Sequence, residues 1–136
     1  MTEKKSRTVL YTLAADTVLV AAFALAGRDT HGGSLTAAGL WETAWPFLGA
    51  LAAAWLLCRA WRSPLRLWPT GVCLWLITVS GGMVLRLVSN HTAAWPFVIV
   101  AFLVLGLFLL GHRLVAARIA RGKRPEPSPA ARLRSK

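Results

Sequence analysis

Four long apolar runs determine what this chain can fold into. They cover about residues 8–27, 41–58, 68–86 and 95–111 of the 136 residues. Each has about the 17–25 apolar residues with which an α-helix crosses the hydrocarbon core of a bilayer. Because the runs take up more than half of the chain, little is left for a separate soluble domain. The sequence therefore predicts an all-α integral membrane protein with four transmembrane helices.

The distribution of Lys and Arg predicts the orientation of these helices. Of the 16 Lys and Arg residues, all but Arg28 and Arg86 lie before the first run, between the second and third runs, or after the fourth. An even number of spans places these three segments on one side of the membrane. Segments rich in Lys and Arg are retained in the cytoplasm. We therefore expect both termini to be cytoplasmic and the protein to lie in the bacterial cytoplasmic membrane.

The segments outside the spans are expected to be tails. Residues 1–7 form a cytoplasmic N-terminal tail, 8–114 a single transmembrane domain, and 115–136 a basic, Pro-rich tail that is largely disordered. A signal peptide is the alternative for the first run, but its length and its internal Asp16 favour a retained span. The basic segments are expected to attract anionic lipid headgroups. Nucleic acid is not an expected partner, because no folded module is left to present the charge.

The sequence Ala-Trp-Pro-Phe occurs twice, after a short polar segment each time. Pro46 and Pro96 are expected in the first turn of a helix, where the missing N–H costs nothing. An Arg and a His precede both copies in the same order, which predicts two repeated helical hairpins related by an axis along the membrane normal. The residues assigned to helix starts and helix packing are Pro46, Phe47, Pro96, Phe97, Gly81 and Gly82.

Asp16 is the candidate functional residue inside a span. It lies roughly 12 Å from the cytoplasmic end of its helix, and a charged group at such a depth is costly unless it is paired. Thr12 shares its helix face, whereas Arg86 lies too close to the outer side for a direct ion pair. Polar groups of the third span at a similar depth, Thr78 and Ser80, are the expected partners. Two interpretations stay open, a proton- or cation-handling role and a purely structural hydrogen bond between helices.

Four basic side chains form a second candidate site at the outer face, where they would bind an anionic ligand. They are Arg28, His31, Arg86 and His91. If the repeat brings them together, they form a cationic mouth, and snorkelling of the arginines from helix ends is the alternative. Two histidines without an acidic or thiolate ligand at a suitable spacing predict no metal site. No cofactor motif and no catalytic grouping is recognisable, so we expect no cofactor and no enzymatic activity.

Several short motifs occur in an order that resembles a family of small bacterial and archaeal membrane proteins, domain of unknown function 3054. The motifs are Asp16, Gly27-Arg28-x-x-His31, Thr43-Ala-Trp-Pro46-Phe47, Gly82-x-x-x-Arg86, Pro96-Phe97 and Leu110-Gly111-x-Arg113. The resemblance covers roughly Tyr11 to Leu114. It implies a four-span inner-membrane protein and no known substrate, cofactor or partner.

Two hypotheses for the function follow from these residues. Asp16 and the cationic mouth favour a small transporter or permeation unit. Since four helices can hardly enclose a pathway alone, this hypothesis predicts a homodimer or a larger assembly. The lack of a catalytic grouping and the basic tail favour the alternative, a non-catalytic membrane scaffold or accessory subunit.

Overall fold

The four apolar runs form four long α-helices in the computed structural model, which describes residues 2–29 and 36–122. The helices are α1 (Thr2–Asp29), α2 (Ala37–Leu57), α3 (Val72–Val88) and α4 (Trp95–Gly122). Two short helical turns, η1 (Ala60–Arg62) and η2 (Leu67–Gly71), connect α2 to α3. The described residues contain no strand, so the predicted all-helical class is confirmed.

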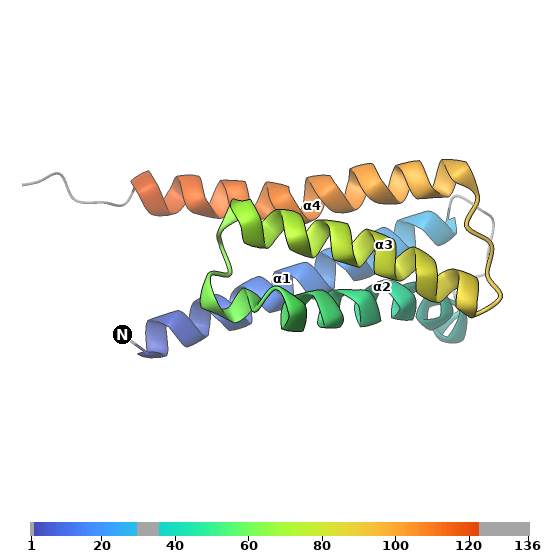
Figure 1. Cartoon of the computed structure of the whole chain (residues 1–136), viewed down its shortest axis with the longest axis horizontal. Helices are drawn as coiled ribbons and strands as arrows, with labels where there is room; N and C mark the ends of the chain where they lie inside the picture. Colours follow the sequence, from blue (N-terminus) through green and yellow to red (C-terminus); the bar gives the residue numbers. More distant parts are fainter. Residues whose placement is uncertain (1, 30–35, 123–136) are drawn as a thin grey trace, which may run out of the picture.

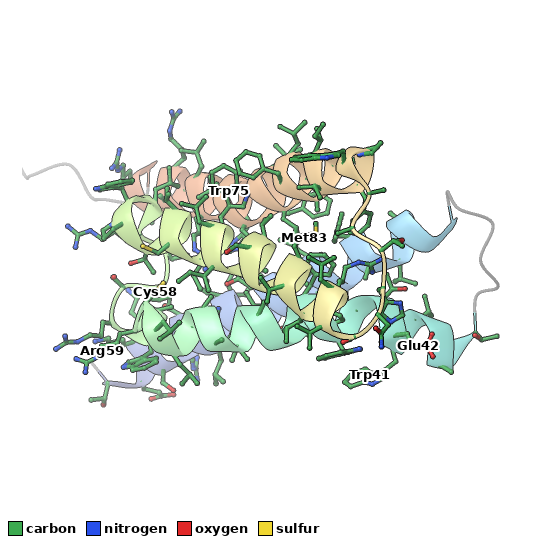
Figure 2. The ribbon with its side chains drawn as sticks, turned by 45° about the vertical axis from the view of Figure 1, so that its right-hand side comes forward. Trp41, Glu42, Cys58, Arg59, Trp75 and Met83 are labelled. Atoms are coloured by element: carbon green, nitrogen blue, oxygen red, sulfur yellow. The ribbon has the colours of Figure 1, made fainter. Side chains whose placement is uncertain are left out.

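The helices run alternately up and down in a bundle (Figure 1). α1 and α3 each pack against both α2 and α4. The N-terminus, the connection between α2 and α3, and the end of α4 lie at one end of the bundle (Figure 1). Cys58 and Arg59 mark this end, whereas Trp41 and Glu42 lie at the opposite end (Figure 2). We call the first the terminal end and the second the distal end of the bundle.

Four helical stretches are long and apolar enough to cross a membrane, namely Thr2–Gly27, Ala37–Leu57, Leu67–Val88 and Trp95–Gly122. Their outward surfaces carry large apolar side chains such as Leu56, Val88 and Leu107, which are 67%, 75% and 70% exposed. Such surfaces suit lipid better than water. The molecule thus has the architecture of a membrane protein, while the repeat of two hairpins and the cytoplasmic position of the termini stay predictions.

The first and last helices, α1 and α4, extend beyond the predicted spans at the terminal end. α1 begins at Thr2, so the segment predicted as an N-terminal tail continues the first helix. An ion pair one helical turn apart, Arg7 Nη2 to Glu3 Oε1 at 2.8 Å, supports this first stretch. α4 continues to Gly122 rather than ending near residue 111. Residues 115–122 of the tail that was predicted to be largely disordered are therefore helical, and the rest of that tail lies outside the described residues.

The two Ala-Trp-Pro-Phe copies occupy different places in their helices. Pro96 is the second residue of α4, in the first turn as predicted. The same prediction is wrong for Pro46, which lies inside α2 because this helix already begins at Ala37. Thr36 caps this earlier start, since its side-chain oxygen accepts a hydrogen bond from the Gly39 N–H at 3.3 Å. Pro46 therefore removes one backbone hydrogen bond within the helix.

The phenylalanines of the two copies meet in the core. Phe47 is fully buried, and its ring centroid lies 5.3 Å from that of Phe23 and 6.1 Å from that of Phe97. Gly82 of α3 faces the Phe47 ring so closely that a methyl group in its place would overlap with it. This aromatic cluster thus joins α1, α2 and α4 in the core.

Candidate functional site

Asp16 and Arg113 form a bidentate ion pair in the interior of the bundle. Both side chains are fully buried. Arg113 Nη1 donates to Asp16 Oδ1 at 2.7 Å, and Arg113 Nη2 donates to Asp16 Oδ2 at 2.6 Å. Parallel charge-assisted hydrogen bonds of this kind are the strongest that protein side chains make. The pair joins α1 to α4 across 97 residues of sequence.

Further hydrogen bonds tie the pair to the rest of the bundle. The indole Nε1 of Trp55 donates to Asp16 Oδ2 at 3.0 Å from α2. Arg113 Nε donates to the carbonyl of Pro64 in the α2–α3 connection at 3.0 Å, and Nη1 also donates to the Leu109 carbonyl at 2.8 Å. A buried ion pair is tolerated only where such bonds replace the lost water. The site is therefore a junction of α1, α2, α4 and the connection.

His112 adds a titratable group to this junction. Its Nε2 lies 2.6 Å from Asp16 Oδ1 and 3.0 Å from Arg113 Nη1. The other ring nitrogen, Nδ1, is buried and has no hydrogen-bond partner among the described residues. The His112 side chain is 17% exposed, whereas the pair beside it is sealed. His112 is thus partly exposed at the surface of the bundle, whereas Asp16 and Arg113 are not.

The position of Nε2 imposes a choice between two hydrogen bonds. Towards the carboxylate of Asp16 it must carry a hydrogen and donate, and towards the guanidinium of Arg113 it must present its lone pair and accept. One nitrogen cannot do both at the same time. The presence or absence of a hydrogen on Nε2, which depends on the tautomer as well as on the charge of the ring, therefore decides whether the ring is attracted to Asp16 or to Arg113.

Helical periodicity places these side chains inside the bundle. Leu105, Leu109 and Arg113 follow each other at intervals of four residues and are all fully buried, so they form one inward stripe of α4. Gly71 makes room for the arginine, since a Cβ there would meet Arg113 Cδ at 3.2 Å. On α1 the corresponding inward stripe is Thr12, Asp16 and Val20, each fully buried.

The expectation that Thr78 and Ser80 pair with Asp16 is wrong. Thr78 is buried, but its hydroxyl has no hydrogen-bond partner among the described residues. Ser80 is exposed and bonds to the Leu76 carbonyl of its own helix at 2.6 Å. The physical reason is that α4 continues past residue 111 and carries Arg113 to the depth of Asp16. A guanidinium then neutralises the carboxylate, which a hydroxyl cannot do.

Thr12, the remaining residue predicted near Asp16, lies one turn before it on the same buried face. Its hydroxyl donates to the Thr8 carbonyl at 2.7 Å, so it is satisfied within α1. Sequence reasoning missed Trp55, His112 and Arg113 as site residues. A signal for Arg113 was available in the four-residue spacing of Leu105, Leu109 and Arg113.

The second predicted site, at the distal end, is described in part. Arg86 is half-buried, donates from Nη2 to the Thr92 carbonyl at 3.2 Å, and its guanidinium carbon lies 4.6 Å from the Phe97 ring centroid. The backbone N–H of His91 donates to the Arg86 carbonyl at 2.9 Å. The Arg28 side chain and His31 lie outside the described residues. Arg86 thus ties the α3–α4 connection to α4, and the cationic mouth stays a prediction.

Among the described residues, no group of three or more His, Cys, Asp and Glu side chains is arranged to hold a metal ion. A protein-family model matches most of the chain. Residues 13–116 match the family described as "Protein of unknown function (DUF3054)", a range that includes all four members of the cluster, Asp16, Trp55, His112 and Arg113. No curated protein and no solved structure matches the chain.

Proposed function

The chain belongs to the DUF3054 family, and we propose a function for it from the cluster of Asp16, His112 and Arg113. We infer that it is a multi-pass protein of the bacterial cytoplasmic membrane that acts as a small transporter or permeation unit driven by a proton. The observation that carries this proposal is the position of His112 Nε2, within 2.6 Å of Asp16 and 3.0 Å of Arg113.

The proton acts on the hydrogen bonds that hold α1 to α4. When His112 Nε2 carries a hydrogen, it donates to Asp16 and competes with Arg113 for the same carboxylate oxygen. When Nε2 is deprotonated, its lone pair accepts from Arg113 and repels the carboxylate. Among the described residues, the charged groups within hydrogen-bonding distance of His112 are Asp16 from α1 and Arg113 from α4. Proton uptake by a neutral ring that carries its hydrogen on Nδ1 therefore changes the favoured arrangement of these two helices.

The two ends of the bundle suit a protein that opens on one side at a time. The terminal end, which the charge bias predicts to be cytoplasmic, holds the partly exposed His112 and the connection that accepts a bond from Arg113. The rings of Phe23, Phe47 and Phe97 pack against one another between α1, α2 and α4, and we propose that they close the bundle towards the distal end. Access from that side needs a movement of the helices or a pathway between two copies. We propose a homodimer for this reason.

Proton flux into reconstituted vesicles tests this proposal. The protein is inserted into vesicles that contain a pH-sensitive dye, and a pH difference is applied with and without a membrane potential. We expect flux above that of protein-free vesicles, and we expect His112→Gln to abolish it. A control variant is Glu3→Gln, which removes an exposed titratable group outside the cluster of Asp16, His112 and Arg113 and should leave the flux unchanged. Equal behaviour of wild type, His112→Gln and empty vesicles would exclude the proton role.

A membrane scaffold is the second candidate function, and one observation favours it. Both oxygens of Asp16 already have hydrogen bonds within the fold, so the pair can serve packing alone. In that case Asp16→Asn lowers the stability, and a partner chain or a lipid co-purifies with the wild type. Native mass spectrometry of the wild type and Asp16→Asn distinguishes the two functions. A small non-lipid ligand lost from the variant supports transport, and a protein partner held by both supports the scaffold.

A further inference from the structure

A groove opens at the terminal end of the bundle, between the α2–α3 connection and the last turns of α4. Its volume is about 240 Å³. The connection forms one wall with Leu65, Arg66 and Leu67. The opposite wall is a single face of α4, since its residues are spaced by three, one and three positions. These residues are Leu114, Ala117, Arg118 and Arg121.

The charge of the groove is positive and without compensation. Arg66, Arg118 and Arg121 line it, and none of the described acidic residues does. All three arginines are exposed, and none forms an ion pair with another described residue. Guanidinium groups bind phosphate oxygens through paired N–H donors. Three such groups around one hollow therefore favour a ligand that carries a phosphate.

The apolar part of the groove indicates the source of that phosphate. Leu67 and Leu114 are 37% and 45% exposed, and both belong to helical stretches long and apolar enough to cross a membrane. The groove thus joins a cationic rim to the lipid-facing side of the helices. A free phosphate ion would use the rim alone, whereas a phospholipid would use both parts.

We propose that this groove binds the headgroup of an anionic phospholipid, with the phosphate held by Arg66, Arg118 and Arg121 and an acyl chain lying along Leu67 and Leu114. The lipid would then connect α4 to the α2–α3 connection, whose Pro64 carbonyl accepts the hydrogen bond from Arg113. This site does not depend on the proton role of His112. Lipid binding at this site differs from the general attraction between the basic tail and anionic lipids, because the bound lipid would occupy one defined position in the groove.

Native mass spectrometry of the full chain released from nanodiscs tests the proposal. The nanodiscs contain equal amounts of phosphatidylcholine and phosphatidylglycerol, and the measurement is the ratio of the two lipids that stay bound. The test variant replaces Arg66, Arg118 and Arg121 with Gln. The matched control replaces Arg7, Arg59 and Arg62 with Gln, which changes the net charge by the same amount. These three arginines are exposed and lie at the same end of the bundle, but they do not line the groove.

We expect the preference for phosphatidylglycerol to fall at least about tenfold further in the test variant than in the control, because the guanidinium groups of the groove would bind the phosphate oxygens directly through paired N–H donors. The control arginines would contribute only the general attraction between basic residues and an anionic surface. Circular dichroism spectra of both variants show whether the fold is kept, which is expected for exposed side chains. Equal losses in the two variants would overturn the proposal, since they would show an attraction without a site.

A second measurement distinguishes a lipid from a free anion. Inorganic phosphate is added to the wild type in detergent, and binding is followed by calorimetry. We expect weak binding of phosphate and no displacement of the retained lipid. Leu114→Asn should then reduce lipid retention without affecting phosphate. Tight phosphate binding that displaces the lipid and ignores Leu114→Asn would overturn the assignment to a lipid.

Discussion

Removal of Arg113 should destabilise the protein more than removal of the whole ion pair. Arg113→Met takes away both N–H donors to Asp16 and leaves a buried carboxylate with Trp55 and His112 as partners. Breaking a buried pair from one side costs about 3–5 kcal/mol. The Pro64 carbonyl also loses its donor, which adds about 1–3 kcal/mol. We therefore expect the free energy of unfolding to fall by about 4–8 kcal/mol.

The second substitution reverses part of this loss. In Asp16→Asn/Arg113→Met no charge is left in the interior, and the isosteric amide can still accept the hydrogen bond from Trp55. Replacing a buried pair by neutral groups is often close to neutral in stability. The double variant should thus be about 2–4 kcal/mol more stable than Arg113→Met alone. A gain in stability from a second mutation is the sign that a buried charge, and not lost packing, causes the first effect.

Unfolding in mixed micelles, followed by circular dichroism against the fraction of denaturing detergent, measures these differences. Arg62→Met serves as the control, because this arginine is exposed and its loss should stay within about 0.5 kcal/mol. A double variant no more stable than Arg113→Met would refute the reasoning, since the Asp16 carboxylate would then carry no penalty when unpaired.

Two further predictions concern packing and thiol chemistry. Gly82→Ala should lower the free energy of unfolding by about 1–3 kcal/mol, because the added methyl overlaps with the Phe47 ring. Gly111→Ala, with no described atom within 4 Å of the new methyl, should be neutral or stabilising by up to about 1 kcal/mol, and thermal unfolding compares the two. Burial, together with the neighbouring Cys73, raises the pKa of the Cys58 thiol, so less thiolate is present at pH 8 than in a free cysteine. Alkylation of Cys58, followed by peptide mass spectrometry, should therefore be slow at this pH and faster after Cys73→Ala, and alkylation at the rate of free cysteine would contradict the described environment.

Some features follow from local sequence alone. The four helices were predictable because apolar runs of membrane-spanning length have few alternative structures. Asp16 was recognisable as a site residue because a carboxylate inside such a run needs a special environment. The family was recognisable from the order of its short motifs, and residues 13–116 bear this out.

The helix ends were predictable only in part. α2 begins before Trp41 because Thr36 supplies the cap. The Pro-Phe pair of the first copy therefore lies inside α2, whereas the Pro-Phe pair of the second copy lies at the start of α4. A polar residue after an apolar run reads as the end of a helix. At His112 and Arg113 the backbone nevertheless stays helical, to Gly122, and its inward face continues.

The partner of Asp16 was decided by tertiary structure. Arg113 lies 97 residues away in sequence, and no local pattern states which face of α4 meets which face of α1. That choice depends on how the four helices pack. Gly71 leaves room for the arginine, and the Pro64 carbonyl accepts a hydrogen bond from it, so both also favour this arrangement. The sequence by itself thus determined that a charge is buried in this membrane bundle. Packing of the helices decided that it is neutralised by a guanidinium and contacted by a histidine.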